Sequence, residues 1–166
     1  MEPWIWCETV SAKERGMAKL LARADREERF SAIVAYVKPD VSAVLDLGCG
    51  IGALTTRLAE RFPSALIVGI DRSKYLLSKL QRKRNTLTAL GDIPDLPLKN
   101  SFFDLVVAVQ VLHEIFHFKG AHALAKTFQN VLGVLKKDGE FLIFDHVNPG
   151  DTSICLKLPS RLLEKP

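Results

Sequence analysis

The stretch from Val44 to Gly52, VLDLGCGIG, limits the possible folds of this chain more than any other. Its first residues are apolar and typical of a strand buried on both faces, with Asp46 near the carboxyl end. The three glycines that follow predict a tight turn, because glycine adopts backbone conformations that other residues avoid. Such a turn leaves the backbone bare of side chains, so we expect a ligand to contact the main chain here.

Further apolar runs of the strand type follow, and helical patterns with a period near 3.6 residues separate most of them. The expected strands are 43–47, 65–71, 86–90, 103–109 and 140–145. The expected helices are two helices or one bent helix within 11–37, then 53–62, 73–80 and 121–135, with a turn at 136–139. Parallel strands joined by helices place those helices on the faces of the sheet. We therefore predict a doubly wound, Rossmann-like α/β fold with a mostly parallel sheet of about five strands and helices on both faces.

The 166 residues suit a single domain, and 48% hydrophobic and 25% charged residues are ordinary globular usage. Within it we predict an amino-terminal helical arm at 1–39, a core at 40–147 and a short tail at 148–166. Trp4 and Trp6 precede the arm's helices, and two interpretations stay open for them. They either cover a pocket as a lid or anchor the arm.

The cysteines and the first residues of the chain indicate the cellular compartment. Cys7, Cys49 and Cys155 have no paired spacing, which indicates neither a disulfide framework nor a cysteine-based zinc site. The start, MEPWIWCETV, lacks the charge and apolar length of a signal peptide, and no window is apolar enough to span a membrane. We expect a cytoplasmic protein with no membrane partner.

The net charge of +4 raises the question of an anionic partner. Much of the excess lies in one run, Lys79, Arg82, Lys83 and Arg84, which we interpret as the solvated end of a helix. A nucleic-acid patch is the alternative interpretation of this run.

The carboxyl ends of parallel strands meet at one edge of a sheet, which is where doubly wound folds bind ligands. Asp46, Asp71, Asp92 and Gln110 all fall at such ends. A carboxylate that ends the second strand, as Asp71 does, is placed to accept both ribose hydroxyls of a nucleoside. A dinucleotide is disfavoured, because GxGxG is followed by Ala53 rather than completing GxGxxG.

Four segments in order, VLDLGCGIG, IVGID, GDIPDLPLKNSFFDLVV and LKKDGEFLIFD, resemble successive motifs of class I S-adenosylmethionine-dependent methyltransferases. The resemblance covers about residues 40–146 and is greatest to the small-molecule branch (methyltransferase type 11) that includes the ubiquinone and menaquinone C-methyltransferases. It implies an enzyme with S-adenosylmethionine as cofactor, S-adenosylhomocysteine as product and a small-molecule methyl acceptor.

The same resemblance implies a set of cofactor-binding residues. Asp46 would bind the amino group of the cofactor, Asp71 the ribose and Asp92 the adenine amino group. The backbone of the glycine turn would line the methionine part, and Gln110 would face the sulfonium. The full implied set is Asp46, Gly48, Cys49, Gly50, Asp71, Arg72, Asp92, Ile93 and Gln110.

His113, Glu114 and His117 spell HEIFH, which matches the HExxH pattern of zinc peptidases. A zinc hydrolase is a remote alternative, because His122 follows Gly120 one residue too early for the third ligand and the methyltransferase resemblance expects a loop here. We predict no metal site. His113 is a candidate either for a general base or for a residue that orients the pocket, while His117 and His122 are expected on the surface.

Two absences bear on the substrate. The (Asn/Asp)-Pro-Pro-aromatic motif of nucleic-acid N-methyltransferases is missing after the fourth expected strand, and so is a Pro-Cys nucleophile. We therefore expect a small acceptor rather than a base in nucleic acid.

The chain departs from the resembled family at its carboxyl end. That family's sheet has seven strands, and residues 146–166 are too few to build the last two. The alternative function is therefore a non-catalytic cofactor-binding or partner-regulating domain. Either the chain is a truncated or degenerate version of that fold, or the open edge of the fifth strand is covered by the tail or by a second copy in a homodimer.

Overall fold

The structure is a computed structural model, and it describes residues 15–16, 27–95, 98 and 101–146. Trp4, Trp6, most of the first predicted helical segment and the tail from 147 onward lie outside the described residues. The predicted division into arm, core and tail therefore stays a prediction.

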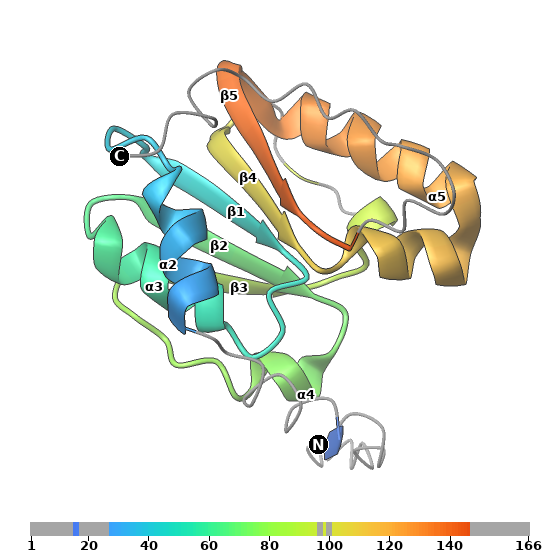
Figure 1. Cartoon of the computed structure of the whole chain (residues 1–166), viewed down its shortest axis with the longest axis horizontal. Coiled ribbons are helices and arrows are strands. Elements are labelled where there is room, and N and C mark those ends of the chain that lie inside the picture. The colour runs from blue at the N-terminus through green and yellow to red at the C-terminus, as the bar shows by residue number, and fades with distance from the viewer. Residues whose placement is uncertain (1–14, 17–26, 96–97, 99–100, 147–166) are drawn as a thin grey trace, which may run out of the picture.

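Five parallel strands form one sheet in the order β3-β2-β1-β4-β5 (Figure 1). The strands are β1 (Ala43–Leu47), β2 (Leu66–Asp71), β3 (Thr86–Leu90), β4 (Phe103–Val109) and β5 (Leu135–Phe144). Successive strands run outward from β1 to β3, and the chain then returns to place β4 on the other side of β1. This reversal defines a switch point between β1 and β4, where ligands bind in such folds. The predicted doubly wound α/β fold is confirmed.

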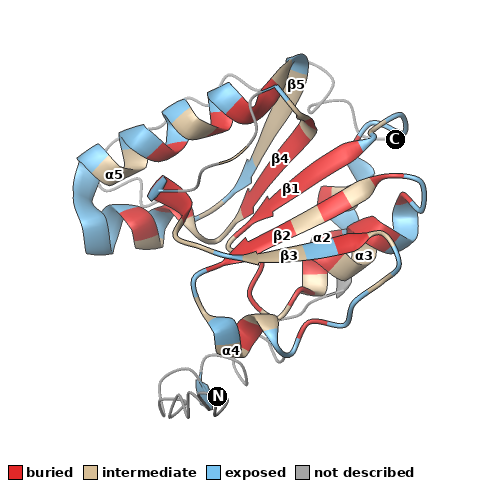
Figure 2. Ribbon diagram, turned by 180° about the vertical axis from the view of Figure 1, so that it is seen from behind, coloured by how far each residue is buried: buried red, intermediate tan, exposed pale blue. Residues whose placement is uncertain are grey.

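Helices cover both faces of the sheet. The helices are α2 (Glu27–Ala35), α3 (Ala53–Arg61), α4 (Lys74–Leu77), the 3-10 turn η1 (Ile93–Asp95) and α5 (Leu112–Val134). Phe30 of α2 and Leu58 of α3 pack with Val44 and Val107 on one face, while Val131 of α5 packs on the other. Every residue of β1 is buried, so the helices on the two faces of the sheet cover this central strand completely (Figure 2).

The segment after β4 is helical, and the loop expected there is wrong. Asp145, which follows β5, accepts hydrogen bonds from the backbone N–H groups of Leu112 (2.8 Å) and His113 (3.1 Å). Because these N–H groups have no partner within the helix, a carboxylate from elsewhere in the chain stabilises the start of α5. Gly120, with φ 78° and ψ 179°, then breaks α5 into two helical parts.

The turn predicted at 136–139 belongs to β5. Leu135 pairs with Phe103 and Glu140 pairs with Leu105, so the intervening residues of β5 face a single residue of β4. The predicted turn is therefore an irregularity within the strand, which begins directly after α5.

The cationic run does not end a helix, so that interpretation is wrong. α4 is capped by Ser73, whose side chain accepts from the N–H of Leu76, but it ends at Leu77. The run lies in the connection to β3, where Lys83 pairs with Glu60 at 2.7 Å. Among the described helices, none has both the length and the apolar character needed to cross a membrane. The cytoplasmic location stays a prediction.

Candidate active site

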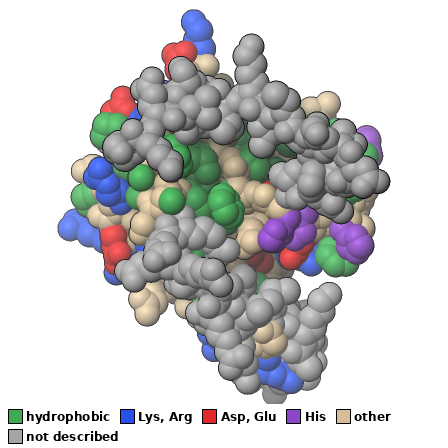
Figure 3. All heavy atoms as spheres, in the orientation of Figure 1, with side chains coloured by type: hydrophobic (Ala, Val, Ile, Leu, Met, Phe, Trp, Pro, Cys, Tyr) green, Lys and Arg blue, Asp and Glu red, His purple; other side chains and the backbone are tan. Residues whose placement is uncertain are grey.

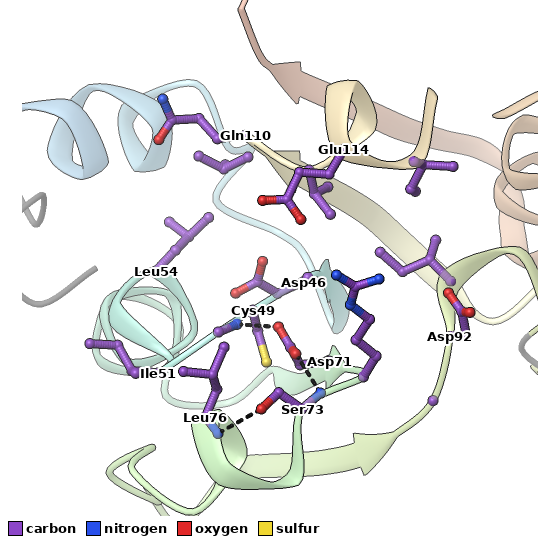
Figure 4. Close-up of a pocket in the computed structure, with 18 of the residues that line it drawn as sticks. Asp46, Cys49, Ile51, Leu54, Asp71, Ser73, Leu76, Asp92, Gln110 and Glu114 are labelled. Atoms are coloured by element: carbon purple, nitrogen blue, oxygen red, sulfur yellow. Dashed lines mark hydrogen bonds between the residues drawn. The ribbon is translucent and has the colours of Figure 1, made fainter. Parts of the chain in front are cut away.

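A cavity of about 440 Å³ opens at the carboxyl ends of β1, β2 and β4 (Figure 4). All nine residues that the resemblance implied for the cofactor line it. The lining also includes residues that sequence reasoning did not select, among them Phe30, Leu54, Glu114 and Lys119. The structure thus brings the predicted set together at the switch point of the sheet.

The glycine turn owes its shape to left-handed backbone conformations. Gly48 has φ 69° and Gly52 has φ 81°, values that cost most other residues free energy. A Cβ added at Gly52 would also lie 2.2 Å from Cγ of Leu80, and one at Gly48 would lie 2.6 Å from Cγ2 of Val111. Conformation and close packing therefore both require glycine at these two positions.

Asp71 ties the glycine turn to the start of α4. Its Oδ2 accepts the backbone N–H of Gly50 at 2.9 Å, and its Oδ1 accepts that of Ser73 at 2.8 Å (Figure 4). The N–H of Cys49 donates to the carbonyl of Ile70 at 2.9 Å, so the turn also follows the end of β2. The carboxylate of Asp71 is buried and held in one orientation by the main chain.

Asp46 is buried at the floor of the cavity with 2% of its surface exposed. The hydroxyl of Thr55 donates to its Oδ2 at 2.6 Å. Burial raises the pKa of Asp46 from 3.8 to about 7; hydrogen bonds from Thr55 oppose this shift, and the charge of Asp71 adds to it. Burial also raises the pKa of the neighbouring Cys49 thiol far above its usual range, so this sulfur is an unreactive part of the wall.

Asp92 and Ile93 reach the cavity from the η1 segment, which α5 holds in place. Lys119 forms an ion pair with Asp92, and Lys126 pairs with Asp95 at 2.5 Å. The side chain of Asn130 donates to the carbonyl of Pro94 at 2.9 Å. The carboxylate expected to meet adenine therefore already has a cation beside it.

Gln110 lies at the end of β4 with φ 53°, and its backbone N–H donates to the carbonyl of Phe144 at 2.8 Å. Its side-chain Nε2 lies 2.9 Å from Nε2 of His146. His113 does not line the cavity, because its Nδ1 lies 2.5 Å from Oδ1 of Asp145. This contact links His113 to the carboxylate that caps α5, and both of its suggested roles, as a general base or in orienting the pocket, stay predictions.

The HEIFH motif lies on a helix, and the described residues around it do not form a metal-binding arrangement. His117 and His122 are exposed, as predicted, and histidine side chains gather at one side of the molecule in Figure 3. Within the part of the chain that the structure describes, no three His, Cys, Asp or Glu side chains come together in a way that suits a metal ion.

Glu114, Ile115, Phe118 and Lys119 are the lining residues of α5 that sequence reasoning missed. Their spacing follows one face of a helix, so the pattern was present. It went unused because the segment was expected to form a loop.

Comparison with known proteins identifies the family of this chain. The sequence profile of a family described as "Methyltransferase domain" matches residues 40–162. The chain belongs to this family. The match spans the whole sheet and every lining residue from Asp46 to Lys119, and it confirms the resemblance to class I S-adenosylmethionine-dependent methyltransferases. It does not single out the ubiquinone and menaquinone branch.

Named relatives share part of their length with this methyltransferase domain. The malonyl-[acyl-carrier protein] O-methyltransferase of Geobacter sulfurreducens is 33% identical over 69% of the chain and 42% of the relative. Sterol 24-C-methyltransferase erg6 of Schizosaccharomyces pombe is 29% identical over 76% of the chain and 33% of the relative. The chain thus spans less than half the length of these relatives.

A solved structure shares the fold. The S-adenosylmethionine-dependent methyltransferase of Mesorhizobium loti aligns with a TM-score of 0.58 and 24% identity. The alignment covers 68% of this chain and 51% of that one.

Proposed function

We propose that the chain binds S-adenosylmethionine in this cavity and transfers its methyl group to a small-molecule acceptor. The observation that supports this most is the joining of the glycine turn to Asp71 through the N–H of Gly50. The carboxylate of Asp71, which we assign to the nucleoside, and the main chain of the glycine turn thereby face the same cavity. The family to which the chain belongs uses this cofactor.

The chemistry of the lining fits the cofactor. S-adenosylmethionine has an ammonium group, a sulfonium, a ribose diol and an adenine amino group, all of which call for hydrogen-bond acceptors or negative charge. The cavity offers Asp46, Asp71 and Asp92 along its length, and its volume lies within the usual range of ligand pockets. In this proposal Asp46 holds the ammonium, Asp71 the ribose and Asp92 the adenine amino group, with Ile93 beside the ring.

The bound cofactor supplies an electrophilic methyl group. The chain contributes to the reaction by holding the acceptor in line with that methyl group and by excluding water, which converts a bimolecular encounter into an oriented one. The apolar side chains of Val109, Val111 and Leu54 line the cavity and provide a surface for the body of the acceptor.

A domain that binds the cofactor without transferring methyl is the second candidate function. Incubating the protein with S-adenosylmethionine and a broad panel of small acceptors, and measuring S-adenosylhomocysteine release, separates the two. Acceptor-dependent release supports transfer, whereas tight cofactor binding with no release above the acceptor-free rate supports the binding domain.

We also propose a homodimer that pairs along β5. This strand lies at an edge of the sheet, and among the described strands it pairs only with β4. Ile143 and Phe144 near its end are 45% and 42% exposed. An edge strand with exposed apolar side chains is a template for pairing with another strand. Sedimentation of the protein as a monomer at all concentrations would rule out this assembly.

A further inference from the structure

Glu114 is a charged side chain in the wall of the cavity that the cofactor assignments above do not use. It lies in the first turns of α5, is half-buried and lines the cavity. Figure 4 shows its carboxylate pointing into the cavity, on the side opposite Asp71 and between Gln110 and Asp92. No hydrogen bond or ion pair joins it to another of the described residues.

The surroundings of Glu114 are apolar or already paired. Val111, which precedes α5, and Ile115, which follows Glu114 on that helix, also line the cavity. Of the two cations in the described lining, Lys119 is engaged by Asp92, and Arg72 follows β2 next to the proposed ribose site. The carboxylate of Glu114 is thus left to interact with a ligand.

We infer that Glu114 selects the methyl acceptor by accepting a hydrogen bond from the O–H or N–H group that is to be methylated. Molecules with a hydroxyl or amine group then bind at this position, and molecules with a carboxylate are repelled. This inference rests on the proposed function, because it assigns the half of the cavity that the cofactor leaves open. A second carboxylate beside Glu114 would meet like charge at short range in a partly desolvated site, which disfavours its binding.

The transfer step balances with Glu114 as proton acceptor. A lone pair on the acceptor oxygen or nitrogen forms a bond to the methyl carbon, and the sulfur–methyl bond breaks with its electron pair moving to sulfur. The acceptor proton passes to the carboxylate of Glu114. A sulfonium cation and a carboxylate anion are thereby converted into a neutral thioether and a neutral acid, so no other reactant is needed.

The test uses the chain saturated with S-adenosylhomocysteine and three fragments of one shape: benzylamine, benzyl alcohol and benzoate. Ligand-observed NMR measures the affinity of each fragment. We expect benzylamine to bind about tenfold more tightly than benzoate, with benzyl alcohol between them, because of the charge of Glu114. In Glu114→Gln the difference between benzylamine and benzoate should fall to about threefold or less. Asp138→Asn removes an exposed carboxylate away from the cavity and should keep the parent's preference.

The affinity for S-adenosylhomocysteine separates failure of this inference from failure of the proposed function. A parent chain that does not bind it refutes the proposed function itself. If the parent binds it and Glu114→Gln binds it at least about tenfold more weakly, Glu114 belongs to the cofactor half and the inference is overturned. Equal binding of benzoate and benzylamine, an unchanged preference in Glu114→Gln, or no fragment binding to the saturated chain also overturns it.

Discussion

The backbone N–H of Gly50 donates a hydrogen bond of 2.9 Å to Oδ2 of Asp71. The two residues belong to different strand–helix connections, and this bond makes the glycine turn and the acid at the end of β2 one unit. The orientation of the proposed ribose acceptor is therefore fixed before any ligand arrives.

Asp71→Asn should destabilise the fold as well as weaken cofactor binding. An amide has one oxygen, so either the N–H of Gly50 or that of Ser73 loses its acceptor in a buried place. Such a loss costs about 1–3 kcal/mol of unfolding free energy. Urea denaturation measures it, with Asp138→Asn as the matched exposed control. Equal stability of Asp71→Asn and the parent would show that these two hydrogen bonds contribute little.

Cofactor binding should strengthen as pH rises through neutrality. Burial raises the pKa of Asp46 to about 7, so below this pH the side chain is neutral and cannot pair with an ammonium group. Thr55, Cys49 and Asp71 are the neighbouring groups that influence this titration. We expect the affinity for S-adenosylhomocysteine to increase between pH 6 and pH 8. At pH values below the pKa of Asp46 the increase should be up to about tenfold for each pH unit. In Asp46→Asn this pH dependence should disappear, and calorimetric titration at several pH values measures it.

The stability of the ligand-free chain should change with pH in the opposite sense. The pKa of Asp46 is raised on folding, so between about 4 and 7 the folded state holds a proton that the unfolded state has lost. The contribution of Asp46 to stability is therefore full below pH 4 and declines as pH rises to about 7. The difference in unfolding free energy between the parent and Asp46→Asn, measured across this range, isolates the contribution. A difference that stays constant with pH would contradict the raised pKa.

Gly52→Ala should be among the most costly single-methyl changes in the core. The new Cβ adds left-handed strain at φ 81° and a contact of 2.2 Å with Leu80. We expect a loss of about 2–4 kcal/mol in unfolding free energy. In a Leu80→Ala background the contacts with Cγ and Cδ1 of Leu80 are removed, and the backbone strain and a 3.1 Å approach to Cβ of residue 80 remain, so the added cost should fall to about 1–2 kcal/mol. The same cost in both backgrounds would show that the side chain of Leu80 moves away from the new Cβ at no cost in unfolding free energy.

Asp145→Ala should loosen the start of α5 and, with it, the wall of the cavity, because the acceptor of the Leu112 and His113 N–H groups is removed. Burial alone would raise the pKa of Asp145, but hydrogen bonds from His113 and from the N–H groups of His146 and His113 outweigh it and lower the pKa. Its stabilising contribution is therefore present above pH 4 and lost as pH falls through the lowered pKa. Loss of this cap should cost about 1–2 kcal/mol near neutral pH. Hydrogen exchange at the amides of Leu112 and His113 measures the loosening, and unchanged protection there would contradict it.

Local pattern was enough to predict the five strands and the position of the site, for a physical reason. Strands buried on both faces read as continuous apolar runs, and parallel strands bring their carboxyl ends to one edge. Asp46, Asp71, Asp92 and Gln110 were therefore placed together without any knowledge of side-chain contacts.

The features that sequence reasoning missed depend on contacts between distant residues. The start of α5 relies on Asp145, which lies 33 residues away from Leu112 in the chain. The family resemblance led us to expect a loop in this segment, and no local signal shows that Asp145 caps a helix there, so Glu114 and Lys119 were not assigned to the cavity. The ion pair between Lys119 and Asp92 joins residues 27 apart and has no local signature.

Titration of the parent chain with S-adenosylhomocysteine tests the central claim most directly. We predict saturable binding of one ligand per chain, an affinity at least about tenfold weaker in Asp71→Ala, and an unchanged affinity in Asp138→Asn. Thermal melts confirm that each variant is folded at the temperature of the titration. No saturable binding to the folded parent, or an Asp71→Ala variant that binds as tightly as the parent, would contradict the account.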